Sequence, residues 1–392
     1  MQTQKTSSLW TGTFILLILL NLFNGVAGQM TLPLVAKFAY SLTPDLTLAS
    51  TVAGLMSLMS LFICPFAGLL SDRFDRKRVL LTAIGGYGMA LLLHALAHNI
   101  SVLIVLRLAT GIFFSVVSVT MVAFSSEFIP RDRLGEGMGY VALSLILSQA
   151  IGPAVGLELV ETLGYQITFA LAGIVAFGSV VVILILPYRA EPREEGPRKR
   201  IVFSDLFAME FFGFMLLATL FSSGNGMIST YLAILAEERG IENVALFFTV
   251  YSACLVLLRP ATGKLLDKRG IYVILVPSII SAALGMVFVG IGYNLGMIVA
   301  AGVFKAVGQG SGTPSLQAHV VKTLDKSRSG VATSTIMIGQ NVGNAVAPIV
   351  GSFFVKSFGY EKMFCGYGVI LLAGGLLILL CQHRKEKRQT LN

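Results

Sequence analysis

Runs of ~20 apolar residues recur along this 392-residue chain, and they limit its possible folds more than any other feature. A helix of that length spans the ~30 Å hydrocarbon core of a bilayer. Hydrophobic residues make up 55% of the chain, charged residues make up 12%, and the mean hydropathy is +0.81. This composition excludes a soluble globular protein, so we predict an all-α polytopic membrane protein.

The alternation of apolar runs and polar breaks predicts twelve transmembrane helices. Their approximate ranges are 10–35, 47–70, 79–98, 101–127, 136–160, 165–187, 205–231, 243–266, 271–293, 295–320, 329–356 and 360–382. The longest polar insert, "YRAEPREEGPRKR", combines charge with Pro and Gly, which is typical of a linker. We therefore predict six-helix bundles at residues 1–187 and 205–392, joined by a cytoplasmic linker at 188–204.

The basic residues gather on one predicted side of the membrane. The loops on that side hold most of the 29 Lys and Arg residues. The opposite loops hold only Lys37, Arg239, Lys356 and Lys362. Because Lys and Arg are enriched in cytoplasmic loops, both termini are predicted to lie in the cytoplasm of a cell-membrane protein. The net charge of +9 then needs no nucleic-acid partner.

Motifs for metal, cofactor or disulfide chemistry are missing from the sequence. The four cysteines lie in or beside apolar segments and form no CxxC pair, which argues against a zinc site or disulfide framework. The glycine-rich "GQGSG" at 308–312 lies inside an apolar helix, which favours helix packing over phosphate binding. We expect no metal, no cofactor and no enzymatic activity.

Two segments are repeated between the halves. "PFAGLLSDR", which begins at Pro65, recurs as "PATGKLLDKR" 195 residues later, at Pro260. "QAIGPAVG", from Gln149, resembles "QNVGNAVA", from Gln340, and a Gly-Tyr pair follows each copy. Two parallel repeats of this kind place a substrate between the halves near the bilayer midplane, and the halves rock around it.

The repeated motifs resemble the major facilitator superfamily across essentially the whole chain. Gly68-x-Leu-Ser-Asp72-Arg73-x-Asp75-Arg76-Lys77 is similar to the loop signature of that family, which usually has Gly at the position of Asp75. Arg107-Leu-Ala-Thr-Gly111 is similar to its Arg-x-x-x-Gly element, and Gly152-Pro153-Ala-Val-Gly156 resembles the helix-5 signature of its exporter branches. Those branches include the drug:proton antiporters. Their pattern ends Gly-Gly, whereas Leu157 follows Gly156 here.

The resemblance implies a cytoplasmic gate around the charged loop. A carboxylate at Asp72 can accept bonds from the first amides of a nearby helix. We expect Arg76 to pair with Glu127, because an acid at that depth needs a partner. The predicted gate comprises Gly68, Asp72, Arg73, Arg76, Lys77, Glu127, Gly263 and Asp267. Gly68 is expected to let its helix approach a neighbour closely. Positive-inside topology alone is the alternative; it accounts for the basic residues but not for Gly68 and Asp72.

The helix-5 motif has its own packing logic. Pro153 removes a backbone hydrogen bond and is expected to kink the helix. Gly152 and Gly156 form a small-xxx-small face for close packing. The resemblance implies that this element seals the central cavity against leak, and ordinary helix packing is the alternative.

Two cations are predicted within the membrane. Arg107 and Lys305 each cost at least ~2.5–3.5 kcal/mol there, so each should face a cavity and have a partner. The sequence has no acid in the middle of any span. These charges favour an anionic or zwitterionic substrate over a cationic drug. Alternatively, Arg107 bonds backbone carbonyls and Lys305 snorkels. The predicted substrate cavity comprises Asn21, Asn24, Gln29, Arg107, Asn225, Tyr231, Lys305, Gln309, Gln340, Asn341 and Asn344.

These features together predict a secondary active exporter that works by rocker-switch alternating access. Its substrate is a small organic compound or drug, its coupling ion is the proton, and it acts in the bilayer as a monomer. Glu127, Glu210 and His319 are weak candidates for the proton carrier. An importer or facilitator of a small polar solute on the same fold is the alternative, and a non-transporting receptor or scaffold is a third class.

Overall fold

The computed structural model describes residues 9–130, 133–188, 211–323 and 329–391. Every regular element within these ranges is a helix, and the predicted fold class is confirmed. Apart from Tyr188, the predicted linker at 188–204 lies outside the described residues.

The chain forms two compact units. Unit 1 comprises Met1–Leu34 and Phe62–Arg193, and unit 2 comprises Val35–Leu61 and Glu194–Asn392. The predicted bundles of residues 1–187 and 205–392 follow the sequence repeat and stay a prediction. The compact units follow the contacts, which group residues 35–61 with unit 2.

Unit 1 contains four helices and the end of a fifth. These are α1 (Gly12–Thr31), α4 (Arg76–His94), α5 (Ile100–Glu127), α6 (Leu134–Ile185) and the last part of α3 (Leu46–Arg73). The helices start at capping residues: the side chain of Thr11 accepts a hydrogen bond from the Phe14 amide, and that of Asn99 from the Val102 amide. α6 packs along both α1 and α4, and buried residues such as Leu17, Ile84 and Phe124 fill the core among them.

Unit 2 contains the remaining helices. These are α2 (Leu34–Leu42) apart from its first residue, the first part of α3, α7 (Phe212–Glu238), α8 (Ala245–Arg269), α9 (Tyr272–Ile291), α10 (Leu295–Val307), α11 (Gln309–Thr323) and α12 (Ser329–Leu391). α12 packs on α7 and α9, and α10 packs on α8 and α9.

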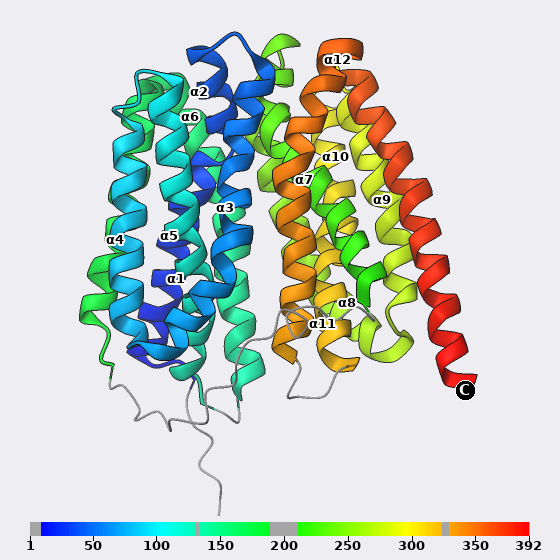
Figure 1. The fold of residues 1–392 in the computed structure, drawn as a ribbon, viewed down its shortest axis with the longest axis horizontal. Coiled ribbons are helices and arrows are strands. Elements are labelled where there is room, and N and C mark those ends of the chain that lie inside the picture. The colour runs from blue at the N-terminus through cyan, green and yellow to red at the C-terminus, as the bar shows by residue number, and fades with distance from the viewer. Residues whose placement is uncertain (1–8, 131–132, 189–210, 324–328, 392) are drawn as a thin grey trace, which may run out of the picture. The chain divides into compact units, whose positions relative to one another are not determined.

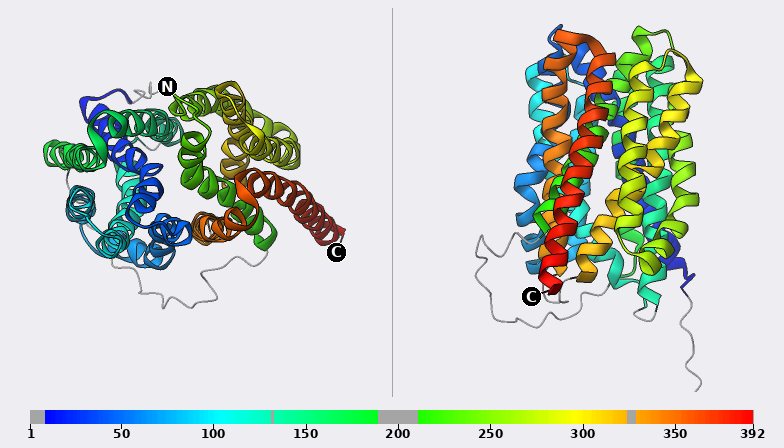
Figure 2. Two further views of the ribbon diagram at one scale, coloured as in Figure 1. Left: turned by 90° about the horizontal axis from the view of Figure 1, so that it is seen from above. Right: turned by 90° about the vertical axis from the view of Figure 1, so that its right-hand side faces the viewer.

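Two helices contain a reversal of the chain. The backbone leaves the helical region at Gly164 (φ 81°, ψ 172°) in α6 and at Gly359 (φ 81°, ψ 169°) in α12. In both views, the orange and red parts of α12 lie side by side and meet at one end (Figures 1 and 2). Each of these helices therefore makes two passes.

The passes agree with the predicted number. Among the described residues, α1 with α2 and α10 with α11 each form one interrupted span, while α6 and α12 each form two, so the helices make twelve passes. By length and composition, seven helical stretches in this part of the chain can cross a membrane. Two of them, Gly137–Ile185 (49 residues) and Thr335–Lys385 (51 residues), are long enough for two passes each.

Candidate functional site

The turn between α3 and α4 carries the dense charge cluster of unit 1. Asp75 is the N-cap of α4, and its Oδ1 accepts a hydrogen bond of 2.8 Å from the Arg78 amide. Its φ of −57° with ψ of 118° is an extended conformation that any L-residue can adopt, so this turn does not need a glycine. Arg73 is exposed in the last turn of α3, and the side chain of Asp72 lies outside the described part of the structure.

Arg76 and Glu127 form the ion pair expected from the sequence. Nη1 of Arg76 lies 2.5 Å from Oε1 of Glu127, and both side chains are partly buried. Arg76 also donates to the carbonyl of Ala123, and Nζ of Lys77 donates to the carbonyl of Leu186 at 2.7 Å. These bonds join the start of α4 to the ends of α5 and α6. The gating role of the cluster stays a prediction.

Among the described residues, the predicted close packing at Gly68 is not found. A Cβ added at Gly68 or at its repeat partner Gly263 would meet no atom of this part of the chain within 4 Å. Sequence spacing does not show which surface of a helix its neighbours cover, and at these glycines the structure leaves open space. The side chain of Asp267 lies outside the described residues.

The helix-5 motif packs directly on the backbone of α1. A Cβ at Gly152 would lie 2.5 Å from Cβ of Gln29 and 2.9 Å from the Met30 nitrogen. A Cβ at Gly156 would collide with the Met30 carbonyl oxygen. Pro153 is buried, and α6 continues through it to the reversal at Gly164. Both glycines are therefore required for the contact between α6 and α1, as the small-xxx-small pattern predicts.

The predicted cavity residues of unit 1 lie on α1 and α5. Nδ2 of Asn21 donates to the carbonyl of Leu17 and to Oγ of Ser125, so Asn21 links the two helices. Oδ1 of Asn24 is buried and has no hydrogen-bond partner among the described residues. Gln29 is half-buried against Gly152.

Arg107 is fully enclosed in unit 1. Its relative exposure is 1%, and Tyr87 of α4 lies within range of its charge. The Tyr87 hydroxyl is also 2.8 Å from where a Cβ of Gly28 would stand, so it lies against α1. Sequence reasoning did not identify Tyr87.

In unit 2, several predicted cavity residues bond to one another. Nδ2 of Asn225 donates to Oδ1 of Asn344 at 3.1 Å, and Nδ2 of Asn344 donates to the carbonyl of Gln340 at 3.0 Å. The Tyr231 hydroxyl donates to the carbonyl of Pro348. These bonds join α7 to the first pass of α12. Asn341 is half-buried on the same stretch of α12.

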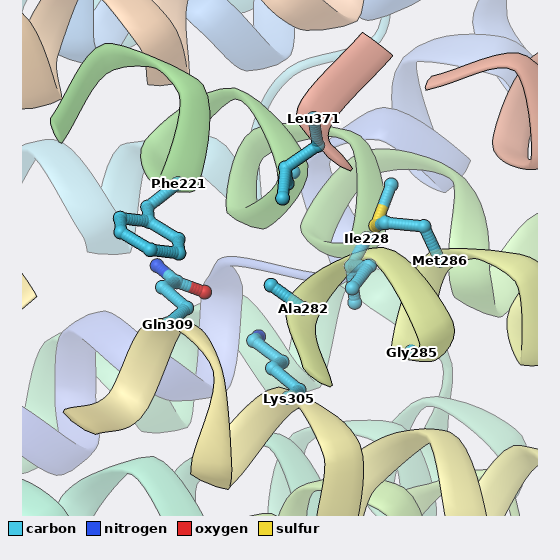
Figure 3. A pocket seen from close by; sticks show the side chains of 9 residues that line it. Phe221, Ile228, Ala282, Gly285, Met286, Lys305, Gln309 and Leu371 are labelled. Atoms are coloured by element: carbon cyan, nitrogen blue, oxygen red, sulfur yellow. The ribbon is translucent and has the colours of Figure 1, made fainter. Parts of the chain in front are cut away.

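Lys305 is buried elsewhere in unit 2, beside two aromatic rings and a small cavity. It is 5% exposed, and its Nζ stands 4.6 Å from the ring centroid of Tyr251 and 5.5 Å from that of Phe247. Lys305 and Gln309 line a small cavity with apolar residues of α7, α9 and α12 (Figure 3). Sequence reasoning missed both rings, although their i, i+4 spacing on α8 places them on one helix face.

Ion pairs fix one end of unit 2. Nζ of Lys37 lies 2.9 Å from Oε2 of Glu237, and Nζ of Lys356 lies 2.6 Å from Oδ1 of Asp45. The hydrogen bond from Lys356 holds the pKa of Asp45 below its ordinary value. These pairs tie α2 and the loop after it to α7 and α12. The sequence showed the two lysines only as loop charges.

Comparisons with known proteins agree with this architecture. The family model described as Major Facilitator Superfamily matches residues 17–292 and 241–392. The multidrug resistance protein MdtG of Dickeya zeae is 25% identical over 395 residues, covering 97% of this chain and 95% of that protein. The MFS-type transporter YuxJ of Bacillus subtilis is 22% identical over 346 residues, covering 86% of this chain and 88% of that protein.

Solved structures share the fold. A POT family transporter in complex with a thioalcohol-conjugated peptide matches with a TM-score of 0.80 at 13% identity, covering 95% of this chain and 96% of that one.

Proposed function

Because the chain belongs to the major facilitator superfamily, whose members are transporters and not enzymes, we propose that it is a secondary active exporter. It moves a small organic compound out of the cell in exchange for protons by rocker-switch alternating access. It acts as a monomer in the cell membrane with both termini in the cytoplasm, the side that the basic loops favour.

The contact between α6 and α1 carries the proposal of export. Gly152 and Gly156 stand against the backbone of Gln29 and Met30 with no room for a Cβ. This is the close contact that a seal against leak needs, and antiport depends on such a seal because a leak would dissipate the proton gradient. The name of the relative MdtG, a multidrug resistance protein, supports export of organic compounds.

Two buried cations support a negatively charged or zwitterionic substrate. Arg107 and Lys305 are 1% and 5% exposed, and no acid stands in the middle of any predicted span. Lys305 has no ion pair among the described residues, so its charge needs compensation at this depth, and a carboxylate of the substrate supplies it. Tyr251 and Phe247 cover part of Lys305, but aromatic rings carry no net charge.

The gate is proposed to close through the charged turn of unit 1. The bonds of Arg76 and Lys77 join the start of α4 to the ends of α5 and α6, and Asp72 and Arg73 lie just before this turn, at the end of α3. In the second half, Gly263 and Asp267 occupy the repeated positions. The remaining polar residues of the two predicted cavity sets would contact the substrate.

The experiment compares dye retention in cells with and without the full chain. We expect the chain to lower retention of carboxyfluorescein, an organic anion, more than that of ethidium, an organic cation. Gly152→Ala and Gly156→Ala should lower export, because overpacking of this kind costs roughly 1–3 kcal/mol. Gly139→Ala in the same helix is the matched control, because a Cβ there meets no atom within 4 Å.

Three results would contradict the proposal. Raised dye retention would indicate an importer, and unchanged retention of every dye would indicate a receptor or scaffold. Proton exchange is tested in everted vesicles, where carboxyfluorescein should dissipate a preformed pH gradient. Uptake of the dye with no change in that gradient would exclude proton coupling.

A further inference from the structure

Lys305 places an amine inside unit 2 without an acidic partner. It is 5% exposed, and no ion pair or hydrogen bond reaches it from the described residues. A buried ammonium is stable only when an opposite charge or hydrogen-bond acceptors compensate for its lost hydration. The described residues around Lys305 therefore supply neither the opposite charge nor the hydrogen-bond acceptor that its ammonium group needs.

Aromatic rings lie on one side of the Lys305 amine, and a small cavity lies on the other. α8 supplies the rings of Tyr251 and Phe247, which face Nζ at 4.6 Å and 5.5 Å but do not line the cavity. α7, α9, α11 and the second pass of α12 supply the cavity wall. Its lining residues are Phe221, Gly224, Ile228, Ala282, Gly285, Met286, Lys305, Gln309 and Leu371. Tyr251 is thus a titratable side chain that faces Lys305 from α8.

A second polar group is directed into the same space. The side chains of Lys305 and Gln309 point toward the region enclosed by Phe221, Ala282 and Leu371 (Figure 3). The side-chain amide of Gln309 has no hydrogen bond among the described residues. An ammonium and a carboxamide can both donate hydrogen bonds to one shared acceptor.

We propose that this cavity binds one monovalent anion between Nζ of Lys305 and the side-chain amide of Gln309. The cavity has room for about one water-sized particle, which is the size of one carboxylate oxygen and slightly smaller than a halide ion. A second charge on the same small anion would face apolar residues and stay uncompensated, so small divalent anions such as sulfate are excluded, whereas a larger organic anion can place a single carboxylate oxygen here. A free halide and the acidic group of an organic substrate share this chemistry.

The test measures thermal unfolding of the purified full-length chain in detergent. Chloride, bromide or acetate is added at millimolar concentrations to a buffer with constant sulfate, so that the general stabilisation by sulfate stays the same in every sample. We expect a saturable rise of roughly 2–4 °C in apparent Tm for the wild type. Lys305→Met should abolish the rise, because Met keeps the length of the side chain and removes the charge. Lys305→Arg should retain part of it.

Two further variants keep the test decisive. Lys37→Met, which removes a surface ion-pair lysine of the same unit, should leave the rise intact. If Lys305→Met does not fold, Gln309→Leu should weaken the rise by removing the second donor. In bromide-soaked crystals, an anomalous peak should lie between Lys305 and Gln309.

The outcomes distinguish a free halide from the acidic group of a substrate. They also distinguish failure of the anion site from failure of the proposed export function. A response to halides alone identifies a free ion, and a response to acetate alone identifies the acidic group of a substrate; both support the site. No saturable response in the wild type, or an equal response in Lys305→Met, would overturn it. The site does not depend on transport direction, so anion binding without dye export would overturn only the proposed function.

Discussion

At the level of single residues, the two halves form the equivalent turn of the repeated loop signature with different residues. Asp75 and Gly270 are separated by the 195 residues that relate the two loop signatures. Gly270 ends α8 with a φ of 79°, a left-handed value that glycine adopts without strain. Asp75 keeps a φ of −57° and uses its carboxylate to cap α4. The departure from the family pattern at Asp75 thus replaces a turn glycine with a helix cap.

This difference predicts opposite sensitivities at the two positions. Asp75→Ala should lower the free energy of unfolding by about 1 kcal/mol, because the Arg78 amide loses its acceptor, whereas Asp75→Asn should retain most of it. Gly270→Ala should cost roughly 1–2 kcal/mol through backbone strain. Denaturant unfolding of the full chain measures both, with hydrogen exchange of the first turn of α4 as a local readout. Equal losses for Asp75→Ala and Asp75→Asn would contradict the capping role.

Some contacts of single residues can be predicted from the sequence and others cannot. The pair of Arg76 and Glu127 was predictable, because an acid and a base at the same membrane depth need each other. The partners of Lys305 were not, because they depend on which helix lies beside α10. The open space at Gly68 was missed for the same reason: spacing along one helix does not reveal what packs against it.

At the level of elements, the internal repeat is visible in the backbone. Gly164 and Gly359 reverse the chain with nearly identical backbone angles. Asn99 is the N-cap of α5, and Asn294 is the N-cap of α10. Each pair is again separated by 195 residues. The sequence predicted the repeated Gly-Tyr pairs. The sequence also predicted short connections here, at residues 161–164 and 357–359, and each reversal lies within its predicted connection. The left-handed backbone of the two glycines was not predicted, because the pattern of apolar runs shows where a span ends but not the φ and ψ angles of the turn.

The positive φ angles at the two chain reversals predict that substitution of either glycine lowers stability through backbone strain, without any steric clash. Gly164→Ala and Gly359→Ala should each cost roughly 1–2 kcal/mol, because a Cβ is disfavoured at a φ of 81° although open space surrounds it. Gly139→Ala, in a helical part of α6 with equal space, should instead stabilise the chain by up to about 1 kcal/mol. Thermal unfolding compares the three variants. Stability changes of one sign in all three would contradict a conformational origin.

The ion pair between the α2–α3 loop and α12 has a predictable pH dependence. The hydrogen bond from Lys356 lowers the pKa of Asp45 below its ordinary 3.8. A lowered pKa in the folded state means that the pair stabilises the fold above the ordinary value, and that this stabilisation is lost as the pH falls through the lowered pKa.

The expected difference in Tm between the wild type and Asp45→Asn is therefore constant from about pH 5 to 8 and shrinks below about pH 4. Thermal scans across that range measure it. Lys37→Met, which breaks the other surface pair of unit 2, shows whether any loss is specific to Asp45. A difference that grew toward low pH would contradict the direction of the shift.

At the level of the whole molecule, the number of passes and the repeat follow from composition and spacing. The apolar runs predict twelve spans because a bilayer fixes their length, and the helices of the described residues agree with them. The grouping of residues 35–61 with the second half was not predictable. It depends on contacts such as those of Asp45 with Lys356, between residues far apart in the sequence.

Topology gives the last prediction, because the charge distribution and the even number of passes together fix the side of every loop. In a variant without Cys64, Cys254, Cys365 and Cys381, single cysteines replace the exposed residues Glu242, Arg78 and Lys385. A membrane-impermeant maleimide should label Glu242→Cys in intact cells. It should label Arg78→Cys and Lys385→Cys only after permeabilisation, because these positions lie among the basic loops that stay inside. Opposite accessibility of Arg78→Cys and Lys385→Cys would place the C-terminus on the other side and contradict an even number of passes between them.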